Sequence, residues 1–534
     1  MSMNALVVLF AGNLSDEVFQ PLIGEKSSLF LGLARSRAFP GVTKTVILTK
    51  SEGILPGLDE FSAVEIEKRD SWTVKTMLEA ISIHAVGYDL VYFTWADYPF
   101  LDPQLADKLA QRHLRYAAEY SYADGWPLGL APELLSPGTA AILVKILGDD
   151  DGGVVSRDAL FSVIKKDINA FDIETEISSV DLRSLRINLC ADSKRNFLLL
   201  QRFTEELTEK VTVTFSEIER IIAEKPEILR TLPAFYPIQV CAGCPQICSY
   251  CPWAIKHGQE LLSGRDHMDV QHFESLLNKI IAFSNDAVID LSLWGELSLH
   301  PHKIELIEAV LTRPELALII ETSGIGWKND ELEYCAELAH KAENTGQKNI
   351  LPPLSWIVSL DSSDPLRYKE VRGAGFAEAN DSAKKLLSLF PKDAYVQAVR
   401  TKGAEDDIER FYRSWKETAP NALSALNTNN VIIQKYDDFC GMLPHKQASD
   451  LSPIQRQPCW HLMRDMPILL DGTVLLCREQ IAADDNKRIT LGNAFNEPLD
   501  AIWEQGQRLY AEQALSKQYN LLCAECDEYY TYNF

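Results

Sequence analysis

Cysteines are the residues with the clearest chemical potential in this chain of 534 residues, which contains eleven of them. Eight fall into a central group and a C-terminal group: Cys241, Cys244, Cys248 and Cys251, then Cys459, Cys477, Cys523 and Cys526. Clustered thiols form disulfides in exported proteins and bind metals in intracellular ones. The apolar run at residues 1–12 predicts a first β-strand rather than an export signal. We therefore expect a cytoplasmic protein whose clustered thiols bind metal.

The central group has a spacing suited to an iron–sulfur cluster. Three residues separate Cys244 from Cys248, and two separate Cys248 from Cys251. Three thiolates on one loop can hold three irons of a cubane cluster and leave the fourth iron open to a substrate or cofactor. If Cys241 is a fourth ligand from the same loop, two alternatives to an open cluster remain. They are a closed four-cysteine cluster for electron transfer and a zinc site.

A regular series of strands and helices is expected to position this loop. Six β-rich apolar runs alternate with helical segments, which predicts a parallel sheet with right-handed crossovers in an open, partial (β/α)6 barrel. Active sites in such barrels lie at the carboxyl ends of the strands. The runs cover residues 236–240, 287–293, 316–320, 356–360, 394–399 and 431–433.

The helix expected after the first of these strands has the clearest pattern. Its apolar residues form one stripe at helical spacing. They are Val270, Phe273, Leu276, Leu277, Ile280 and Ile281. Further helices are expected around residues 304–311, 332–342, 383–390 and 408–415.

The regions on either side of the barrel differ from it in pattern. Residues 6–11, 43–48 and 89–94 predict buried parallel strands of an N-terminal α/β domain. The last ninety or so residues are rich in loops and predict a hairpin of residues 466–470 and 473–476 around Asp471-Gly472. We therefore expect three domains, residues 1–231, 232–445 and 446–534. The first two are expected to be of the α/β class, and the third to be a small C-terminal domain.

Composition narrows the function classes. The chain is 46% hydrophobic and 24% charged, as is usual for a globular protein, and it lacks the ~20-residue apolar run of a membrane span. Its 76 acidic and 52 basic side chains give a formal charge of −24. Because such a field repels phosphate backbones and anionic lipids, we expect neither nucleic acid nor a membrane as a partner.

The central loop resembles that of the radical S-adenosylmethionine (SAM) superfamily. The resemblance rests on the spacing of Cys244, Cys248 and Cys251, on Tyr250 before the last thiol, and on the position after the first barrel strand. It implies that the three cysteines ligate a 4Fe–4S cluster and that SAM chelates the open iron. Reductive cleavage of SAM would then yield a 5′-deoxyadenosyl radical.

Two later strand ends also resemble this superfamily. Trp294-Gly295-Glu296 is similar to a Gly-Gly-Glu motif that holds the SAM ammonium, with Trp294 as a departure. Ser359-Leu360-Asp361 and Arg372-Gly373 resemble segments of the peptide-modifying branch. A solvated loop acid is the alternative for Glu296, and a helix cap or a surface ion pair is the alternative for Asp361 and Arg372.

Other polar residues at strand ends are weaker candidates for SAM binding. Thr322 and Ser323 end the third strand, and Gln397 and Arg400 lie on the fifth. Hydrogen bonding within the loops is an equally good account of such residues. The resulting cofactor-binding set is Gly295, Glu296, Ser323, Ser359, Asp361, Arg372, Gln397 and Tyr250, and no catalytic residue is assigned.

The C-terminal cysteines resemble the SPASM extension of radical SAM enzymes. Twelve residues, Gly472 and four more residues separate Cys459 from Cys477, and Cys523-Ala-Glu-Cys526 follows. Four ligands correspond to the shortened, twitch-like form with one auxiliary 4Fe–4S cluster. A structural zinc on the same four thiolates is the alternative.

The N-terminal domain resembles sugar-nucleotide cytidylyltransferases and the related glycosyltransferase-A fold. Lys26 and Asp97 match a phosphate-binding lysine and a metal-binding aspartate, although acids follow Gly12 where the family has glycine and arginine. A degenerate nucleotidyltransferase-like domain is therefore expected. The three-part architecture resembles spiro-SPASM proteins.

Together these resemblances imply a radical SAM enzyme that receives electrons from a flavodoxin or ferredoxin. The implied substrate is a peptide or protein, or else a nucleotide-linked sugar. The second hypothesis is a nucleotidyltransferase-like binding protein whose metal centres are structural or redox-sensing.

Overall fold

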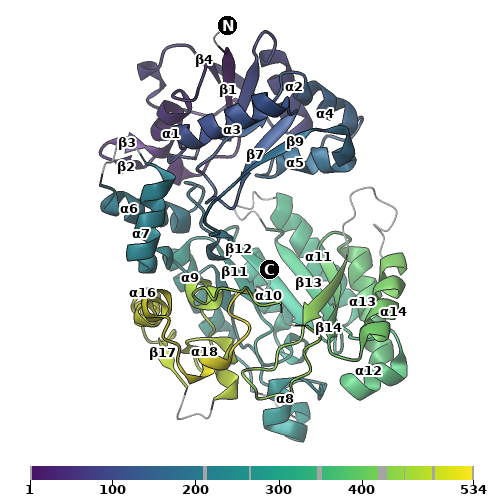
Figure 1. Cartoon of the computed structure of the whole chain (residues 1–534). Helices are drawn as coiled ribbons and strands as arrows, with labels where there is room; N and C mark the ends of the chain where they lie inside the picture. The colour runs from purple at the N-terminus through teal and green to yellow at the C-terminus, as the bar shows by residue number, and fades with distance from the viewer. Residues whose placement is uncertain are drawn as a thin grey trace. The chain divides into compact units, whose positions relative to one another are not determined.

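The chain forms two compact units, Met1–Thr231 and Leu232–Phe534, drawn in Figure 1. The computed structural model describes residues 3–208, 213–263, 266–344, 351–418, 430–449, 451–483 and 488–531. Each unit contains one large β-sheet with helices packed on it. The predicted α/β fold class is confirmed.

The first unit is built on a seven-stranded sheet in the order β5-β4-β1-β6-β8-β7-β9. Its central strand β1 is buried at every position, as expected for a strand covered on both faces. All neighbours are parallel except β8, which runs antiparallel to both β6 and β7. The strands are β1 (Ala5–Ala11), β4 (Val42–Lys50), β5 (Val64–Arg69), β6 (Leu90–Trp95), β7 (Tyr120–Asp124), β8 (Glu133–Leu135) and β9 (Ile173–Ile177), with a small hairpin of β2 (Pro21–Ile23) and β3 (Lys26–Ser27).

The helices of the first unit begin at clear sequence signals. The Asp102 carboxylate accepts hydrogen bonds from the backbone N–H groups of Gln104 and Leu105, and Pro103 occupies the first helical position of α3. The helices are α1 (Ser28–Ser36), α2 (Val74–His84), α3 (Pro103–Tyr116), α4 (Thr139–Leu147), α5 (Ala159–Ile164), α6 (Lys194–Glu206) and α7 (Phe215–Glu224).

The second unit contains the predicted six-stranded sheet. Its order β10-β11-β12-β13-β14-β15 follows the chain, and every neighbouring pair is parallel. Each strand overlaps one of the six predicted apolar runs, and the first two are shorter than expected. The strands are β10 (Phe235–Pro237), β11 (Ala287–Asp290), β12 (Leu316–Thr322), β13 (Leu354–Ser359), β14 (Ala394–Arg400) and β15 (Val431–Lys435).

Alternation along these strands separates an outer core from an inner face. Leu318 and Ile320 of β12 pack in the large core beneath the helices. Ile319 of the same strand packs with Phe235 and Ile357 in a separate apolar cluster on the other side. Because successive side chains of a strand point to opposite faces, Glu321 lies on this inner face with Ile319.

Helices cover the outer side of the six-stranded sheet, as α11, α13 and α14 show beside β13 and β14 in Figure 1. The predicted apolar stripe of α9 is confirmed, since Phe273, Leu276 and Ile280 are buried in the large core. None of the described helices is long and apolar enough to cross a bilayer. The helices are α8 (Pro252–His257), α9 (Val270–Ser284), α10 (Lys303–Leu311), α11 (Asn329–Asn344), α12 (Pro365–Val371), α13 (Phe376–Leu389) and α14 (Glu405–Thr418).

The C-terminal segment is joined to the edge of this sheet. The backbone N–H groups of Met466 and Ile468 donate to the carbonyls of Phe235 and Pro237 beside β10. Met466, Ile468 and Val474 also belong to the large core. The predicted division at residue 446 stays a prediction, because barrel and C-terminal segment share this core.

The predicted C-terminal hairpin needs a correction. Gly472 makes the expected turn with a φ of 83°, but residues 466–470 form bridges rather than a strand. The predicted pairing is kept in part, since Ile468 forms an antiparallel bridge with Val474. β16 (Thr473–Leu475) pairs as a strand with β17 (Thr490–Asn493), and residues 466–468 also bond to the sheet edge. The remaining helices are α15 (Trp460–Arg464), α16 (Leu499–Gln505), α17 (Gln507–Ala511) and α18 (Leu521–Glu525).

The packing of α9 gives a test of the barrel core. Leu277 is fully buried, so Leu277→Ala leaves a cavity and should lower the free energy of unfolding by about 2–5 kcal/mol. Glu274→Ala, on the exposed side of the same helix, should change it by less than about 0.5 kcal/mol. Urea unfolding followed by fluorescence measures both, and equal effects would contradict the assigned face of α9.

Candidate functional site

The cysteine loop follows β10 at the carboxyl edge of the six-stranded sheet. The backbone N–H of Cys244 donates to the Leu261 carbonyl at 3.1 Å, and Cys251 directly precedes α8, where Pro252 takes the first helical position. The thiol of Cys244 interacts electrostatically with those of Cys248 and Cys251. The structure therefore brings together the three cysteines that the spacing singled out.

Burial distinguishes these thiols from water-exposed ones. Cys248 is 9% exposed, and burial raises the pKa of its thiol to about 12, although the nearby Arg372 charge opposes this shift. Burial also raises the pKa of Cys244 and Cys251. Metal binding must displace these protons, so a bound cluster would itself hold the thiols ionised. Three neighbouring thiols suit an iron–sulfur cluster.

Cys241 and Gly295 lie in close contact. Cys241 forms an isolated antiparallel bridge with His267 and is 2% exposed. A Cβ atom at position 295 would lie 1.6 Å from the Cys241 carbonyl oxygen, so only glycine can occupy this position. The glycine of the Trp294-Gly295-Glu296 motif thus allows the backbone of the second strand end to contact the backbone of Cys241 directly.

Glu296 ties the end of β11 to the end of β12. It is 3% exposed; its Oε1 accepts a hydrogen bond from Thr322 Oγ1 at 2.5 Å, and its Oε2 accepts one from the Ser323 backbone N–H at 2.8 Å. Burial raises the pKa of Glu296, and these hydrogen bonds oppose the shift. The alternative of a solvated loop acid is wrong, because both carboxylate oxygens are bonded inside the protein.

The departure at Trp294 has a packing explanation. Its indole ring stacks on that of Trp253 in α8, with ring centroids 5.7 Å apart. Leu475 and Ile481 of the C-terminal segment complete the same apolar cluster. A large ring at this position therefore joins the cysteine loop to the C-terminal segment, and Trp294 adopts a positive φ of 45° in doing so.

Asp361 and Arg372 form a buried ion pair behind the cysteine loop. Arg372 Nη1 lies 2.6 Å from Asp361 Oδ2, and the two side chains are 9% and 5% exposed. Tyr250 Oη donates to the same Asp361 oxygen and accepts a hydrogen bond from Arg372 Nη1 at 2.9 Å. The alternative of a surface ion pair is therefore wrong for these residues, while Arg372 also occupies the C-cap position of α12, as the helix-cap alternative has it.

This ion pair also reaches the loop and the fifth strand of the sheet. Arg372 Nε donates to Oε1 of Gln246 at 3.1 Å, and Gln246 lies in the sequence between Cys244 and Cys248. Asp361 Oδ1 accepts from the Val399 backbone N–H at 2.8 Å. The three groups predicted to contact SAM at this place, Tyr250, Asp361 and Arg372, thus contact one another and fix the loop.

A second polar group lies on the inner face. Ser359 Oγ and Gln397 Nε2 both donate to Glu321 Oε1 at 2.8 Å. Glu321 was not among the predicted residues, and the signal for it is an acid in an otherwise apolar strand. Arg400, at the end of β14, is exposed. Ser359 and Gln397 are therefore brought together, and Arg400 lies outside this group.

The C-terminal thiols also gather, and they include one more than predicted. Cys459 interacts electrostatically with Cys523 and Cys526, and Cys477 with Cys459 and Cys526. A hydrogen bond between Cys440 and Cys526 raises the pKa of Cys440 and lowers that of Cys526. Cys440 was missed because it lies nineteen residues before Cys459 and outside the motif.

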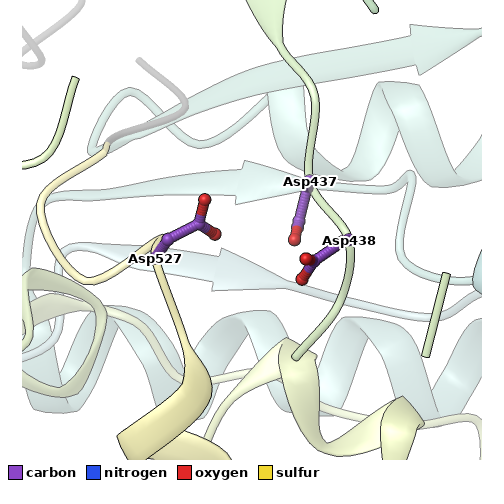
Figure 2. A group of neighbouring side chains, drawn as sticks. All are labelled: Asp437, Asp438 and Asp527. Carbon is purple, nitrogen blue, oxygen red and sulfur yellow. The ribbon is translucent and has the colours of Figure 1, made fainter. Parts of the chain in front are cut away.

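Three acids that neighbour two of these cysteines in the sequence form a group, shown in Figure 2. The carboxylates of Asp437 and Asp438, which precede Cys440, and of Asp527, which follows Cys526, point toward one another with oxygens within 4.8 Å. Lys435 Nζ lies 2.8 Å from Asp527 Oδ2, so one of the three charges is already compensated. The ion pair of Lys435 with Asp527 joins the end of β15 to the residue after Cys526.

The predicted phosphate and metal residues of the N-terminal unit lie in other roles. Lys26 Nζ lies over the Phe30 ring, 5.0 Å from its centroid. Asp97 is 2% exposed, and both its oxygens accept hydrogen bonds from Arg157. Because a guanidinium already occupies both oxygens, Asp97 does not fit a divalent cation, and the metal-dependent role expected from the resemblance is not supported.

The close approach of Gly295 predicts intolerance to any side chain. Gly295→Ala should push the Cys241 backbone away, cost at least about 1–3 kcal/mol of stability and reduce iron incorporation after anaerobic reconstitution. Gly138→Ala is the matched control, since a Cβ there meets no atom within 4 Å. Unchanged iron content in Gly295→Ala would contradict the contact.

The Asp361–Arg372 pair predicts strong coupling. Asp361→Asn or Arg372→Met alone should each cost about 3–5 kcal/mol, because one charge stays buried without its partner. The double variant should cost clearly less than the sum. The exposed pair Glu409–Arg413 serves as a control, with a coupling below about 1 kcal/mol. Urea unfolding of the four proteins measures this cycle, and additive costs would refute the coupling.

Two solved structures are partly similar to this chain. A cytidylyltransferase from Leptospira borgpetersenii matches 43% of this chain and 96% of its own, with 16% identity and a TM-score of 0.36. SuiB from Streptococcus suis, bound to its precursor peptide SuiA, matches 73% of this chain and 86% of its own, with 14% identity and a TM-score of 0.39.

The C-terminal cysteines match a known domain family. The SPASM family model, described as an iron–sulfur cluster-binding domain, matches residues 459–527. These residues include all four predicted C-terminal ligands. The predicted resemblance to SPASM proteins, and with it the expectation of an iron–sulfur cluster-binding domain, is confirmed.

A longer relationship links the chain to an uncharacterized protein of Treponema pallidum (strain Nichols). The two are 36% identical over 382 residues, which cover 70% of this chain and 98% of that protein. A second uncharacterized protein of the same organism is 39% identical over 61 residues, 11% of this chain and 28% of its own. The chain therefore belongs to the family of the first Treponema pallidum protein and carries a SPASM iron–sulfur cluster-binding domain.

Proposed function

We propose that this chain is a radical SAM enzyme whose reaction takes place at the carboxyl edge of the six-stranded sheet. The observation that carries the proposal is the set of three neighbouring thiols, Cys244, Cys248 and Cys251, on one loop at that edge. Three thiolates leave one iron of a cubane cluster without a protein ligand. The SPASM domain in the same compact unit supports this assignment.

The proposed cofactors are a 4Fe–4S cluster held by these three cysteines and SAM beside it. When bound and reduced, they supply a 5′-deoxyadenosyl radical, which abstracts a hydrogen atom from the substrate. A flavodoxin or ferredoxin in the cytoplasm is the proposed electron donor. The remaining residues of the site bind, orient and shield the reactants.

Glu296 is the proposed ligand of the SAM ammonium group. A buried carboxylate attracts a cationic amine through a charge-assisted hydrogen bond. Thr322 and Ser323 already orient both of its oxygens. Ser359, Gln397 and Glu321 offer a hydroxyl, an amide and a carboxylate on the inner face, which suits the hydroxyl groups of a ribose.

Tyr250, Asp361 and Arg372 are proposed as positioning residues for the cysteine loop. Their buried hydrogen bonds join the loop to the ends of β13 and β14. A loop held in this way keeps its three thiols in one arrangement before the cluster binds, which reduces the cost of ordering them.

Cys459, Cys477, Cys523 and Cys526 are the proposed ligands of an auxiliary 4Fe–4S cluster that accepts or relays an electron. Cys440 lies within hydrogen-bond distance of Cys526, so five thiols surround this site. Cluster binding would also stabilise a segment of short helices and two short strands.

A peptide or protein is the proposed substrate class. SPASM proteins often modify peptides, and the partly similar SuiB is described as bound to a precursor peptide. A nucleotide-linked sugar is the other substrate considered, since the N-terminal unit resembles a cytidylyltransferase. Protection of the full-length chain against thermal unfolding by a nucleotide sugar, but not by peptides, would favour the sugar.

Iron content and SAM turnover test the proposal. After anaerobic reconstitution, the chain should bind about eight irons, and reduction with SAM should release 5′-deoxyadenosine. Cys248→Ala should bind about four irons and release no 5′-deoxyadenosine. Cys477→Ala should lose the auxiliary cluster of the C-terminal segment instead. Cys335→Ala, a buried cysteine of the helical core, should resemble the parent protein.

Retention of SAM cleavage in Cys248→Ala, or zinc in place of iron, would refute the proposal. Zinc in place of iron, with no SAM cleavage, would favour the nucleotidyltransferase-like binding protein, which also predicts loss of function in Asp97→Ala. The ion pair between Asp97 and Arg157 disfavours that second hypothesis.

A further inference from the structure

The N-terminal unit contains a cavity of about 320 Å³ that the proposed radical chemistry does not use. It lies beside β6, β7, β8 and the start of α5. Seven aromatic side chains line it: Phe93, Trp95, Tyr98, Tyr120, Tyr122, Trp126 and Phe161. This volume is suited to a small organic ligand.

The aromatic rings form a continuous wall. The rings of Tyr120 and Tyr122 are stacked, with centroids 5.6 Å apart and planes inclined by 23°. The Phe161 ring lies 6.2 Å from that of Tyr122 and 6.5 Å from that of Tyr120. The faces of such rings carry negative electrostatic potential, which attracts cations.

An acid without a cationic partner completes this wall. Glu133 accepts a hydrogen bond from Tyr120 Oη, and within the described part of the chain it forms no ion pair. Burial raises the pKa of Glu133 to about 7, and the hydrogen bond from Tyr120 opposes this shift. Asp158 lines the same cavity and adds a second negative charge.

Arg157 is the basic residue that lines the cavity, and its charge is already compensated. Its guanidinium forms a bidentate pair with Asp97 and lies 3.2 Å from Asp192 Oδ2. It also stacks over the Trp95 ring, 4.2 Å from the centroid. The cavity therefore keeps a negative balance, and the Tyr122 and Phe161 rings and the Glu133 carboxylate belong to its lining.

We propose that this cavity binds a small organic cation, an alkyl-substituted ammonium group enclosed by Tyr120, Tyr122 and Phe161 and neutralised by Glu133. An alkylated ammonium is weakly hydrated, so it loses little by leaving water and gains contact with the ring faces. A phosphate-bearing ligand is disfavoured here, because Glu133 and Asp158 would repel it. The proposal goes beyond the radical chemistry and does not depend on it.

Binding of choline and of its uncharged isostere, 3,3-dimethyl-1-butanol, to the full-length reconstituted protein tests the proposal. Calorimetric titration should show choline binding about 2- to 30-fold more tightly than the isostere, the range that one cation–π contact provides. The comparison needs no variant, so it does not depend on the folding of a mutant. Equal affinity for the two compounds, or no binding of choline, would overturn the proposal.

Two variants locate the site. Glu133→Gln and Tyr122→Leu should each weaken choline binding about 2- to 30-fold. Because the isostere carries no charge, Glu133→Gln should leave its weak binding nearly unchanged. Tyr116→Leu, an exposed aromatic residue on α3 outside the cavity, is the matched control and should bind choline as the parent does. Choline affinity unchanged in both cavity variants would place the cation elsewhere and contradict the assignment.

Discussion

The buried ion pair between Asp361 and Arg372 is the interaction on which the arrangement of the cysteine loop depends. A charge pair with side chains less than a tenth exposed is costly to form, and it is retained only with further hydrogen bonds. Tyr250, Gln246 and the backbone of Val399 provide them. The pair thereby links the loop to two strands that are distant in the sequence, and the three thiols inherit their arrangement from the sheet.

The second constraint is the close packing of backbone at the first two strand ends. Gly295 lies against the carbonyl of Cys241, and Glu296 is held by the end of β12. Trp294, which departs from the expected glycine, packs on Trp253 and on the C-terminal segment. One short stretch of three residues thus joins the cysteine loop, the third strand and the SPASM domain, which explains why barrel and C-terminal segment form one compact unit.

The N-terminal unit shows how a fold can persist while its expected chemistry changes. The sheet contains the predicted parallel strands, yet Arg157 occupies the carboxylate that would bind a metal. Because Arg157 pairs with Asp97, it does not pair with Glu133, the acid of the aromatic cavity beside it. The pairing of Asp97 with Arg157 therefore disfavours metal-dependent phosphate transfer by this unit.

The sequence by itself determined the α/β class, the six parallel strands and the two groups of cysteines. Strand-length apolar runs and the apolar stripe of α9 are local patterns, which can be recognised without knowing the tertiary structure. The spacing of the cysteines within each motif is likewise a property of the sequence alone. Tertiary structure decided which polar groups meet. Glu321 joins Ser359 and Gln397, Cys440 joins Cys526, and Arg157 joins Asp97, in each case across a long stretch of chain. No local pattern encodes such contacts, because they arise from strand register and the packing of distant segments.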